Sequence, residues 1–181
     1  QFEYIDLGGG MGINYDNQKI KLNLKKYSKI VEKFVKKYRS KIIFEPGRSI
    51  IGNAGILISK VIYIKQGFKK DFVILDAAMN NLMRPALYGA KHQILPVKKG
   101  NSKSKKMYEF VGPICESTDK FSSIKNFQKL NEDDLVIICD VGAYGTSLSS
   151  NYNLRPNAAE ILIKKSNIKL IKKRQLLKDI I

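Results

Sequence analysis

The first 50 residues alternate between strand-like and helix-like patterns. Residues 2–7 alternate loosely between apolar and polar side chains and run into glycines at 8–10 and 12, which is typical of a strand entering a turn. Residues 24–38 place apolar side chains three and one positions apart, which predicts an amphipathic helix. Residues 41–44 form a short apolar strand that stops at Glu45-Pro46-Gly47-Arg48. This order predicts βα units of a parallel sheet or a (β/α) barrel.

After residue 50 the pattern changes to apolar strands with short connections. We expect strands at 54–64, 72–76, 93–97, 108–112 and 135–140, and a hairpin of 159–163 and 168–171 across Ser166-Asn167. Such a series predicts an antiparallel β-sandwich or barrel domain. We therefore expect residues 1–50 and 51–181 to form separate parts, with an exposed loop at 98–106.

The predicted fold class is the C-terminal part of a (β/α)8 barrel followed by this antiparallel domain. Two βα units cannot close a barrel that normally needs eight. On their own they would expose sheet edges and a helix face. We expect the rest of the barrel to lie in an N-terminal part that is missing from the sequence.

Charge and composition narrow the classes of partner. The chain has 33 Lys and Arg against 16 Asp and Glu, a net charge of +17. Only five of these cations are Arg, the lysines are scattered, and no nucleic-acid module is present. We expect solvated basic faces and no nucleic-acid partner, although a basic face toward an acidic partner stays open. No apolar run reaches the roughly 18 residues of a membrane span, so no membrane partner is expected.

The two cysteines have different sequence neighbourhoods. Cys139 ends an apolar run and is predicted to be a buried small hydrophobe, whereas Cys115 lies in a polar, turn-rich context that suits a functional thiol. Two thiols without a secretory signal predict a reducing, cytoplasmic location. Because the sequence has no CxxC motif or His/Cys cluster, no metal site is expected.

Two loops carry candidate binding chemistry. Glycines at 8–10 can point backbone N–H groups at an anion. Glu45 and Arg48 follow the next predicted strand, and the carboxyl ends of parallel strands meet at one edge. A cofactor site is one interpretation. A structural turn and an ordinary surface ion pair are the alternatives.

Six blocks in order resemble the diaminopimelate decarboxylase family. They are DLGGGMG (6–12), EPGRS (45–49), DAAMNNLMRPALY (76–88), VGPICESTD (111–119), GAYG (142–145) and YNLRP (152–156). The resemblance covers essentially all 181 residues and corresponds to the C-terminal half of the family. It implies a pyridoxal 5′-phosphate enzyme with an alanine-racemase-like barrel and a β domain.

The resemblance also implies a cofactor-binding set. Glu45 would hold the proton on the ring nitrogen, and Tyr144 would complete the phosphate and substrate end of the site. The 5′-phosphate would lie against the backbone of the two loops, so that the set comprises Gly8, Gly9, Gly10, Glu45, Pro46, Gly47, Arg48 and Tyr144.

Substrate roles follow from the same resemblance. Arg48, Arg84 and Tyr88 would bind the distal carboxylate, with Tyr144 close by. Glu116 would bind the distal ammonium, and Cys115 would protonate the α-carbon as the catalytic acid. In the family the Cys-Glu pair reaches into the other subunit, which implies a homodimer with shared active sites.

Some family features differ or are absent. Ala78, Asn81 and Asn14 replace the common Gly, Asp and Pro. The family's Schiff-base lysine and the histidine stacked on the cofactor lie in the N-terminal part, so no lysine is assigned here and the chain alone is predicted to be inactive. His92, the single histidine, is interpreted as structural or as a supporting residue behind the site.

Three functions are compatible with these sequence motifs. The first is decarboxylation of meso-2,6-diaminopimelate to L-lysine and CO₂. The second is a non-catalytic fragment or paralogue that dimerises with an intact partner. The third is a sister decarboxylase for carboxynorspermidine-like substrates, against which Arg84, Tyr88 and Glu116 argue.

Overall fold

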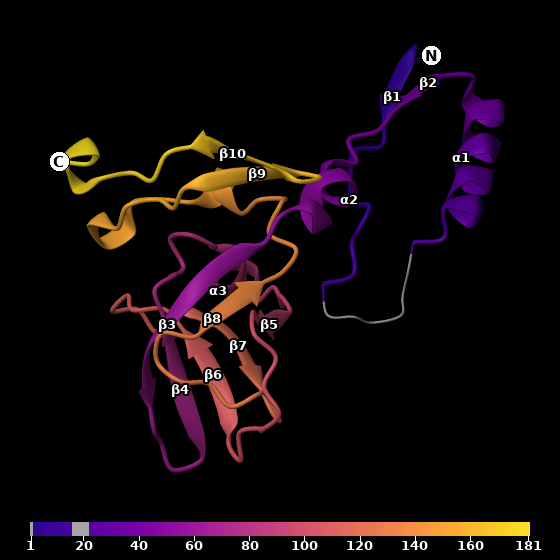
Figure 1. The fold of residues 1–181 in the computed structure, drawn as a ribbon. Helices are drawn as coiled ribbons and strands as arrows, with labels where there is room; N and C mark the ends of the chain where they lie inside the picture. The colour runs from indigo at the N-terminus through magenta and orange to yellow at the C-terminus, as the bar shows by residue number, and fades with distance from the viewer. Residues whose placement is uncertain (1, 16–21) are drawn as a thin grey trace.

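The N-terminal part of the chain contains one helix beside two parallel strands. The computed structural model describes residues 2–15 and 22–181. Strand β1 (Tyr4–Asp6) pairs in parallel with β2 (Lys41–Ile43), and α1 (Leu24–Tyr38) precedes β2. Figure 1 shows this unit projecting away from the main sheet. The predicted order of strand, helix and strand is confirmed.

Helix α1 is capped at both ends. The Asn23 side chain accepts a hydrogen bond from the Lys26 N–H at 3.0 Å, which satisfies a free donor of the first turn. Arg39 ends the helix in a left-handed conformation with φ 53°. No residue of α1 is buried, and Ile30 is 66% exposed. Four of its apolar residues are half-buried, so the described part of the chain covers the apolar face of this helix only in part: Tyr27, Val31, Phe34 and Val35.

The main body is a six-stranded sheet. It follows the short helix α2 (Gly47–Ile51) and the 3₁₀ turn η1 (Gly52–Ala54). Its strands are β3 (Leu57–Lys65), β4 (Lys70–Leu75), β5 (Ile94–Pro96), β6 (Met107–Val111), β7 (Lys120–Ile124) and β8 (Leu135–Ile138), in the order β5-β8-β3-β4-β6-β7.

This sheet is mixed, so the prediction of a purely antiparallel domain is wrong. Strands β4 and β6 are parallel, with Lys70 opposite Met107 and Ile74 opposite Val111. The connection between them includes α3 (Arg84–Tyr88) and β5, which lets the chain return to the same end of the sheet. Neither α3 nor β7 was predicted, because α3 begins with Arg-Pro and β7 is largely polar.

The core lies on one face of the sheet. Val61, Val73, Phe110 and Val136 have no exposed surface, and the rings of Phe110 and Phe127 pack with centroids 5.0 Å apart. Cys139 is only half-buried, contrary to the prediction that it is fully buried, because it lies just beyond the end of β8.

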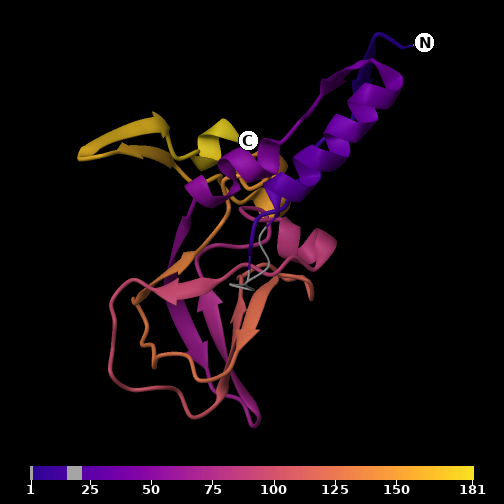
Figure 2. The same ribbon diagram turned by 90° about the vertical axis from the view of Figure 1, so that its right-hand side faces the viewer.

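The C-terminal segment forms the predicted hairpin. Strands β9 (Glu160–Lys164) and β10 (Asn167–Lys172) are antiparallel. The turn lies at Lys165 and Ser166, one residue before the predicted Ser166-Asn167, because Lys165 adopts φ 56° and Asn167 already pairs with Lys164. Two 3₁₀ turns, η2 (Thr146–Leu148) and η3 (Tyr152–Leu154), precede the hairpin, and η4 (Leu177–Asp179) follows it. Figures 1 and 2 both show the hairpin extending from the side of the main sheet.

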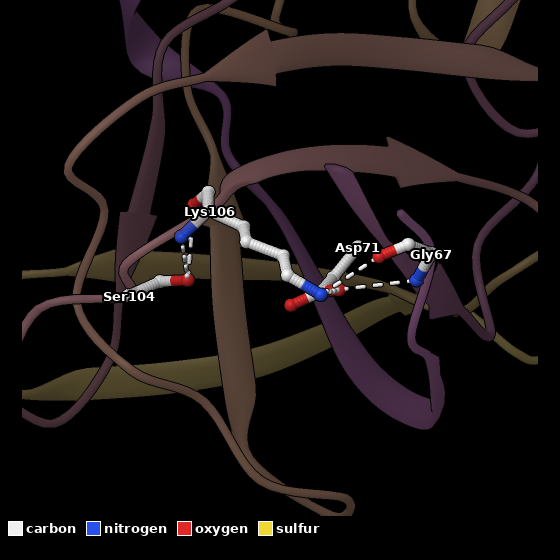
Figure 3. Close-up of polar contacts among 4 residues, drawn as sticks. All are labelled: Gly67, Asp71, Ser104 and Lys106. Carbon is white, nitrogen blue, oxygen red and sulfur yellow. Dashed lines mark hydrogen bonds and ion pairs between the residues drawn. The ribbon is translucent and has the colours of Figure 1, made fainter. Parts of the chain in front are cut away.

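Lys106 fastens the end of the long loop before β6. Its ammonium donates to the Gly67 carbonyl at 2.7 Å and lies 3.5 Å from the Asp71 carboxylate (Figure 3). The Ser104 hydroxyl donates to the Lys106 carbonyl at 3.0 Å. This lysine therefore ties the loop to the β3–β4 turn instead of standing free in solvent.

Within the described ranges, no helix is both long and apolar enough to cross a membrane.

Candidate functional site

The glycine loop and the Glu45 loop lie side by side. Because β1 and β2 are parallel, their carboxyl ends meet at one edge of the pair. The Glu45 N–H donates to the Gly8 carbonyl at 2.9 Å. A Cβ at Gly9 would lie 2.5 Å from the Glu45 carbonyl oxygen, so only glycine permits this approach. The predicted proximity of the two loops is confirmed.

The glycine loop leaves two backbone donors open. Gly8 and Gly10 adopt left-handed conformations with φ 64° and 75°. The Asp6 carboxylate accepts the N–H of Gly8 at 2.7 Å, so this donor is already used. The N–H groups of Gly9 and Gly10 have no partner among the described residues. These two groups are the ones that can bind an anion.

Arg48 lies in α2, directly after the Glu45-Pro46 turn. Its Nε is buried and has no hydrogen-bond partner in the described part of the chain. Buried donors are nearly always paired in folded proteins, so an unpaired one points to a missing acceptor. The Arg48 guanidinium lies over the Tyr144 ring, 5.8 Å from its centroid.

A tight contact of the GAYG segment positions Tyr144. The Gly142 N–H donates to the Gly52 carbonyl at 3.0 Å. A Cβ at Gly142 would lie 2.0 Å from the Ile51 carbonyl oxygen, so glycine is required. Tyr144 then takes a left-handed conformation, φ 62°. This contact connects α2, which carries Arg48, to a segment about 90 residues later in the sequence.

Tyr144 lies between two arginines. The guanidinium of Arg84 is 5.9 Å from its ring centroid, close to the distance of Arg48. Arg84 is 7% exposed at the start of α3, so it does not lie in a surface turn. Its guanidinium also stacks on Tyr15 at 4.5 Å. Tyr88, one turn further along α3, is 67% exposed.

His92 supports Arg84 from behind. Its Nε2 lies 3.1 Å from Arg84 Nη1, and its Nδ1 lies 2.8 Å from the Cys139 carbonyl. Burial lowers the pKa of His92, and the positive charge of Arg84 acts in the same direction. The sequence predicted a structural or supporting role for His92 but did not indicate that its partner is Arg84. No sequence signal indicated Tyr15, whose ring edge packs against His92.

The Cys115–Glu116 loop connects β6 to β7 and is exposed. The Asp119 carboxylate accepts the N–H of Ile114 at 2.8 Å and the N–H of Met79 at 2.7 Å. The first bond closes the loop, and the second joins it to the segment before α3. The Thr118 backbone N–H lowers the pKa of Glu116, with further help from the Ser117 hydroxyl. No hydrogen bond or ion pair joins Cys115 or Glu116 to Arg48 or Arg84 among the described residues.

Two of the three departures from the family pattern have local explanations. Ala78 is buried and is not among the described residues with positive φ, as the replacement of glycine requires. The Asn81 side chain accepts the Ala78 N–H at 3.1 Å, so it stabilises this turn. Among the described residues, no hydrogen bond or ion pair joins Asn81 to Arg84.

Comparison with known proteins identifies the class to which this fold and site belong. Residues 12–142 match the family model described as "Pyridoxal-dependent decarboxylase, C-terminal sheet domain". This match includes the mixed sheet, α2, α3 and the Cys115 loop. The chain therefore belongs to the pyridoxal-dependent decarboxylase family.

The relatives within this family are more particular. The chain is 40% identical over 173 residues to the diaminopimelate decarboxylase of Aquifex aeolicus, which covers 96% of the chain and 41% of that relative. A crystal structure of diaminopimelate decarboxylase from Helicobacter pylori complexed with L-lysine matches with a TM-score of 0.86 and 39% identity, over 98% of this chain and 43% of that one.

A second diaminopimelate decarboxylase structure and a less similar decarboxylase structure extend the comparison. The diaminopimelate decarboxylase of M. jannaschii has a TM-score of 0.90 at 36% identity, over 99% of this chain and 42% of that one. A lysine/ornithine decarboxylase from Vibrio vulnificus shares the fold at 23% identity and a TM-score of 0.74. The chain thus spans about two fifths of the length of its diaminopimelate decarboxylase relatives.

Proposed function

We propose that the complete polypeptide containing this chain converts meso-2,6-diaminopimelate to L-lysine and CO₂ with pyridoxal 5′-phosphate. The single observation that carries this proposal is the cluster of Arg48, Tyr144 and Arg84 next to the glycine loop and Glu45. Similarity to diaminopimelate decarboxylases over nearly the whole chain supports it. Residues 1–50 would complete the cofactor barrel, and residues 51–181 would form the sheet domain.

The residues present fit the cofactor. A phosphate needs N–H donors, which Gly9 and Gly10 offer, and Arg48 Nε is a buried donor in need of an acceptor. No Cβ at Gly10 or Gly47 would meet another atom within 4 Å, so the backbone there is open to a ligand. Pyridoxal phosphate, when bound, accepts the electron pair left by the departing CO₂. Glu45 would hold the ring-nitrogen proton that this chemistry requires.

Arg84 is the proposed anchor for the distal carboxylate of the substrate. Its guanidinium donates to His92 through Nη1, and its other N–H groups have no partner among the described residues. A planar guanidinium matches a carboxylate with two parallel hydrogen bonds. Arg48, Tyr88 and Tyr144 would contribute to this end of the site. A buried cation left without its carboxylate would disfavour substrates that lack the group.

Cys115 is the proposed proton donor to the α-carbon, and Glu116 the proposed partner of the distal ammonium. Cys115 is exposed and Glu116 is half-buried on a loop that Asp119 holds in shape. The family resemblance implies that this loop serves the site of a second subunit. The proposed assembly is a homodimer with shared active sites.

The test is decarboxylation by the complete polypeptide supplied with pyridoxal phosphate. We expect L-lysine and CO₂ in equal amounts from meso-diaminopimelate, and little turnover of ornithine or carboxynorspermidine. Turnover of carboxynorspermidine alone would establish the sister decarboxylase instead. Cofactor binding without any turnover would establish the non-catalytic paralogue. We expect the 181 residues alone to be inactive, since none of their lysines is assigned to bind the cofactor.

A further inference from the structure

The hydrogen bonds of His92 determine its protonation state. A guanidinium can only donate, so the Nε2 that faces Arg84 at 3.1 Å must carry a lone pair. A carbonyl can only accept, so the Nδ1 that faces the Cys139 oxygen at 2.8 Å must carry the hydrogen. The ring is therefore the neutral tautomer with hydrogen on Nδ1. Every other protonation state breaks at least one of these two bonds.

The surroundings of the ring stabilise this neutral form. His92 is 3% exposed, and the Tyr15 ring packs edge-on against it with centroids 5.1 Å apart. The charged groups that act on it are Arg84 from α3 and Asp140 from the segment after β8. Burial and Arg84 disfavour the protonated ring, whereas the Cys139 carbonyl and Asp140 favour it. Burial and Arg84 outweigh these two effects, so the pKa of His92 is lowered.

The same contact fixes the orientation of Arg84. The guanidinium is a rigid plane, so a hydrogen bond at Nη1 together with the Tyr15 ring, 4.5 Å from its central carbon, leaves little freedom to rotate. Tyr144 lies 5.9 Å from the same carbon. The remaining N–H groups of Arg84 are then held ready for an incoming anion.

We propose that His92 is a positioning residue that orients Arg84 to bind the distal carboxylate of the substrate. This inference rests on the proposed function, because it assumes a substrate with a second carboxylate. Protonation of His92 would remove the acceptor and place two cations in contact. Acid that protonates His92 would then weaken substrate binding through Arg84.

Two variants of similar size separate the two hydrogen bonds. In His92→Asn the amide nitrogen replaces Nδ1 and keeps the bond to the Cys139 carbonyl, but nothing reaches Arg84. In His92→Gln the amide oxygen reaches the position of Nε2 and keeps the bond to Arg84. In the complete polypeptide, we expect His92→Asn to raise the KM for meso-diaminopimelate about tenfold with little change in kcat. We expect His92→Gln to keep a KM close to that of the wild type.

A spectroscopic measurement tests the contact without substrate. In ¹⁵N-histidine-labelled polypeptide, the His92 signals are those that disappear in His92→Gln. At neutral pH we expect a protonated Nδ1 and an unprotonated Nε2. Arg84→Met should raise the pKa of His92, because a neighbouring cation is removed. Lys91→Met, which removes an exposed cation next to His92 in the sequence, should leave it unchanged.

The outcomes separate this inference from the proposed function. Equal increases of KM in both His92 variants, or no increase in His92→Asn, would overturn the positioning role. A protonated Nε2 at neutral pH, or a His92 pKa that does not respond to Arg84→Met, would overturn the contact itself. A wild-type polypeptide that shows the expected tautomer but does not act on diaminopimelate would instead refute the proposed function.

Discussion

The backbone N–H of Glu45 donates a hydrogen bond to the carbonyl of Gly8 at 2.9 Å. This bond joins the ends of two parallel strands and brings a carboxylate beside a turn with two open N–H donors. The proposed cofactor site depends on this approach. Substitutions that separate the two loops should therefore weaken cofactor binding more than they destabilise the main sheet.

Gly9→Ala should weaken the binding of pyridoxal phosphate. The added Cβ would lie 2.5 Å from the Glu45 carbonyl oxygen, a backbone atom that cannot move aside without separating the loops. We expect a loss of about tenfold or more in cofactor affinity, measured by the visible absorbance of the bound cofactor during titration. Gly12→Ala is the matched control, since its Cβ would meet nothing within 4 Å. Equal affinities for the two variants would show that the contact is dispensable.

Asp119→Asn should destabilise the Cys115 loop. The carboxylate accepts two backbone N–H groups, from Ile114 and Met79, whereas an amide has only one oxygen to offer. We expect a loss of about 1–3 kcal/mol in the free energy of unfolding, measured by urea titration. Glu132→Gln, on an exposed side chain, should change stability very little. A neutral effect of Asp119→Asn would mean that water replaces the lost hydrogen bond.

Cys115→Ala should retain the cofactor absorbance but lose most turnover. An exposed thiol adds little to folding, and its proposed task is transfer of one proton, which contributes about 10²- to 10⁴-fold in comparable steps. Cys139→Ala is the matched control, because that side chain has no proposed catalytic task. Normal decarboxylation by Cys115→Ala would remove the proton-donor assignment.

Arg84→Ala should raise the KM for meso-diaminopimelate strongly, by about 30-fold or more, because a buried charged hydrogen-bond partner of the carboxylate is removed. Steady-state kinetics of the complete polypeptide measure this change. Arg174→Ala removes the same side chain from an exposed position and should have no effect. An unchanged KM in Arg84→Ala would show that another residue binds the distal carboxylate.

The stability of the sheet domain should fall with acid through His92. Its pKa in the folded protein is lowered from the ordinary value of 6.5, so the unfolded chain takes up a proton first as the pH decreases. Stability is therefore unaffected by this group well above pH 6.5 and declines below it, until the folded pKa is reached. Urea unfolding at a series of pH values should show a shallower decline in His92→Gln. Parallel declines in the two proteins would exclude His92 as the source.

Sequence patterns determined the features that depend on neighbours along the chain. The spacing of apolar residues in 24–38 predicted α1, and the apolar pattern of 159–171 predicted the C-terminal hairpin, although its turn lies one residue before the predicted Ser166-Asn167. The proximity of Gly9 and Glu45 also followed from the sequence, because the ends of adjacent parallel strands must lie at the same edge. The ordered motifs indicated the decarboxylase family, since each short block adds to the specificity of the others.

Only the tertiary structure decided the features that depend on long-range packing. The parallel pairing of β4 with β6 depends on how the chain between them crosses the sheet, which local patterns do not encode. Tyr144 reaches Arg48 and Arg84 because Gly142 packs on the carbonyl of Ile51, a contact between distant segments. The hydrogen bond from Arg84 to His92 likewise needs α3 and the end of β8 in place. The sequence could name these side chains, but folding alone brings them within hydrogen-bonding and stacking distance.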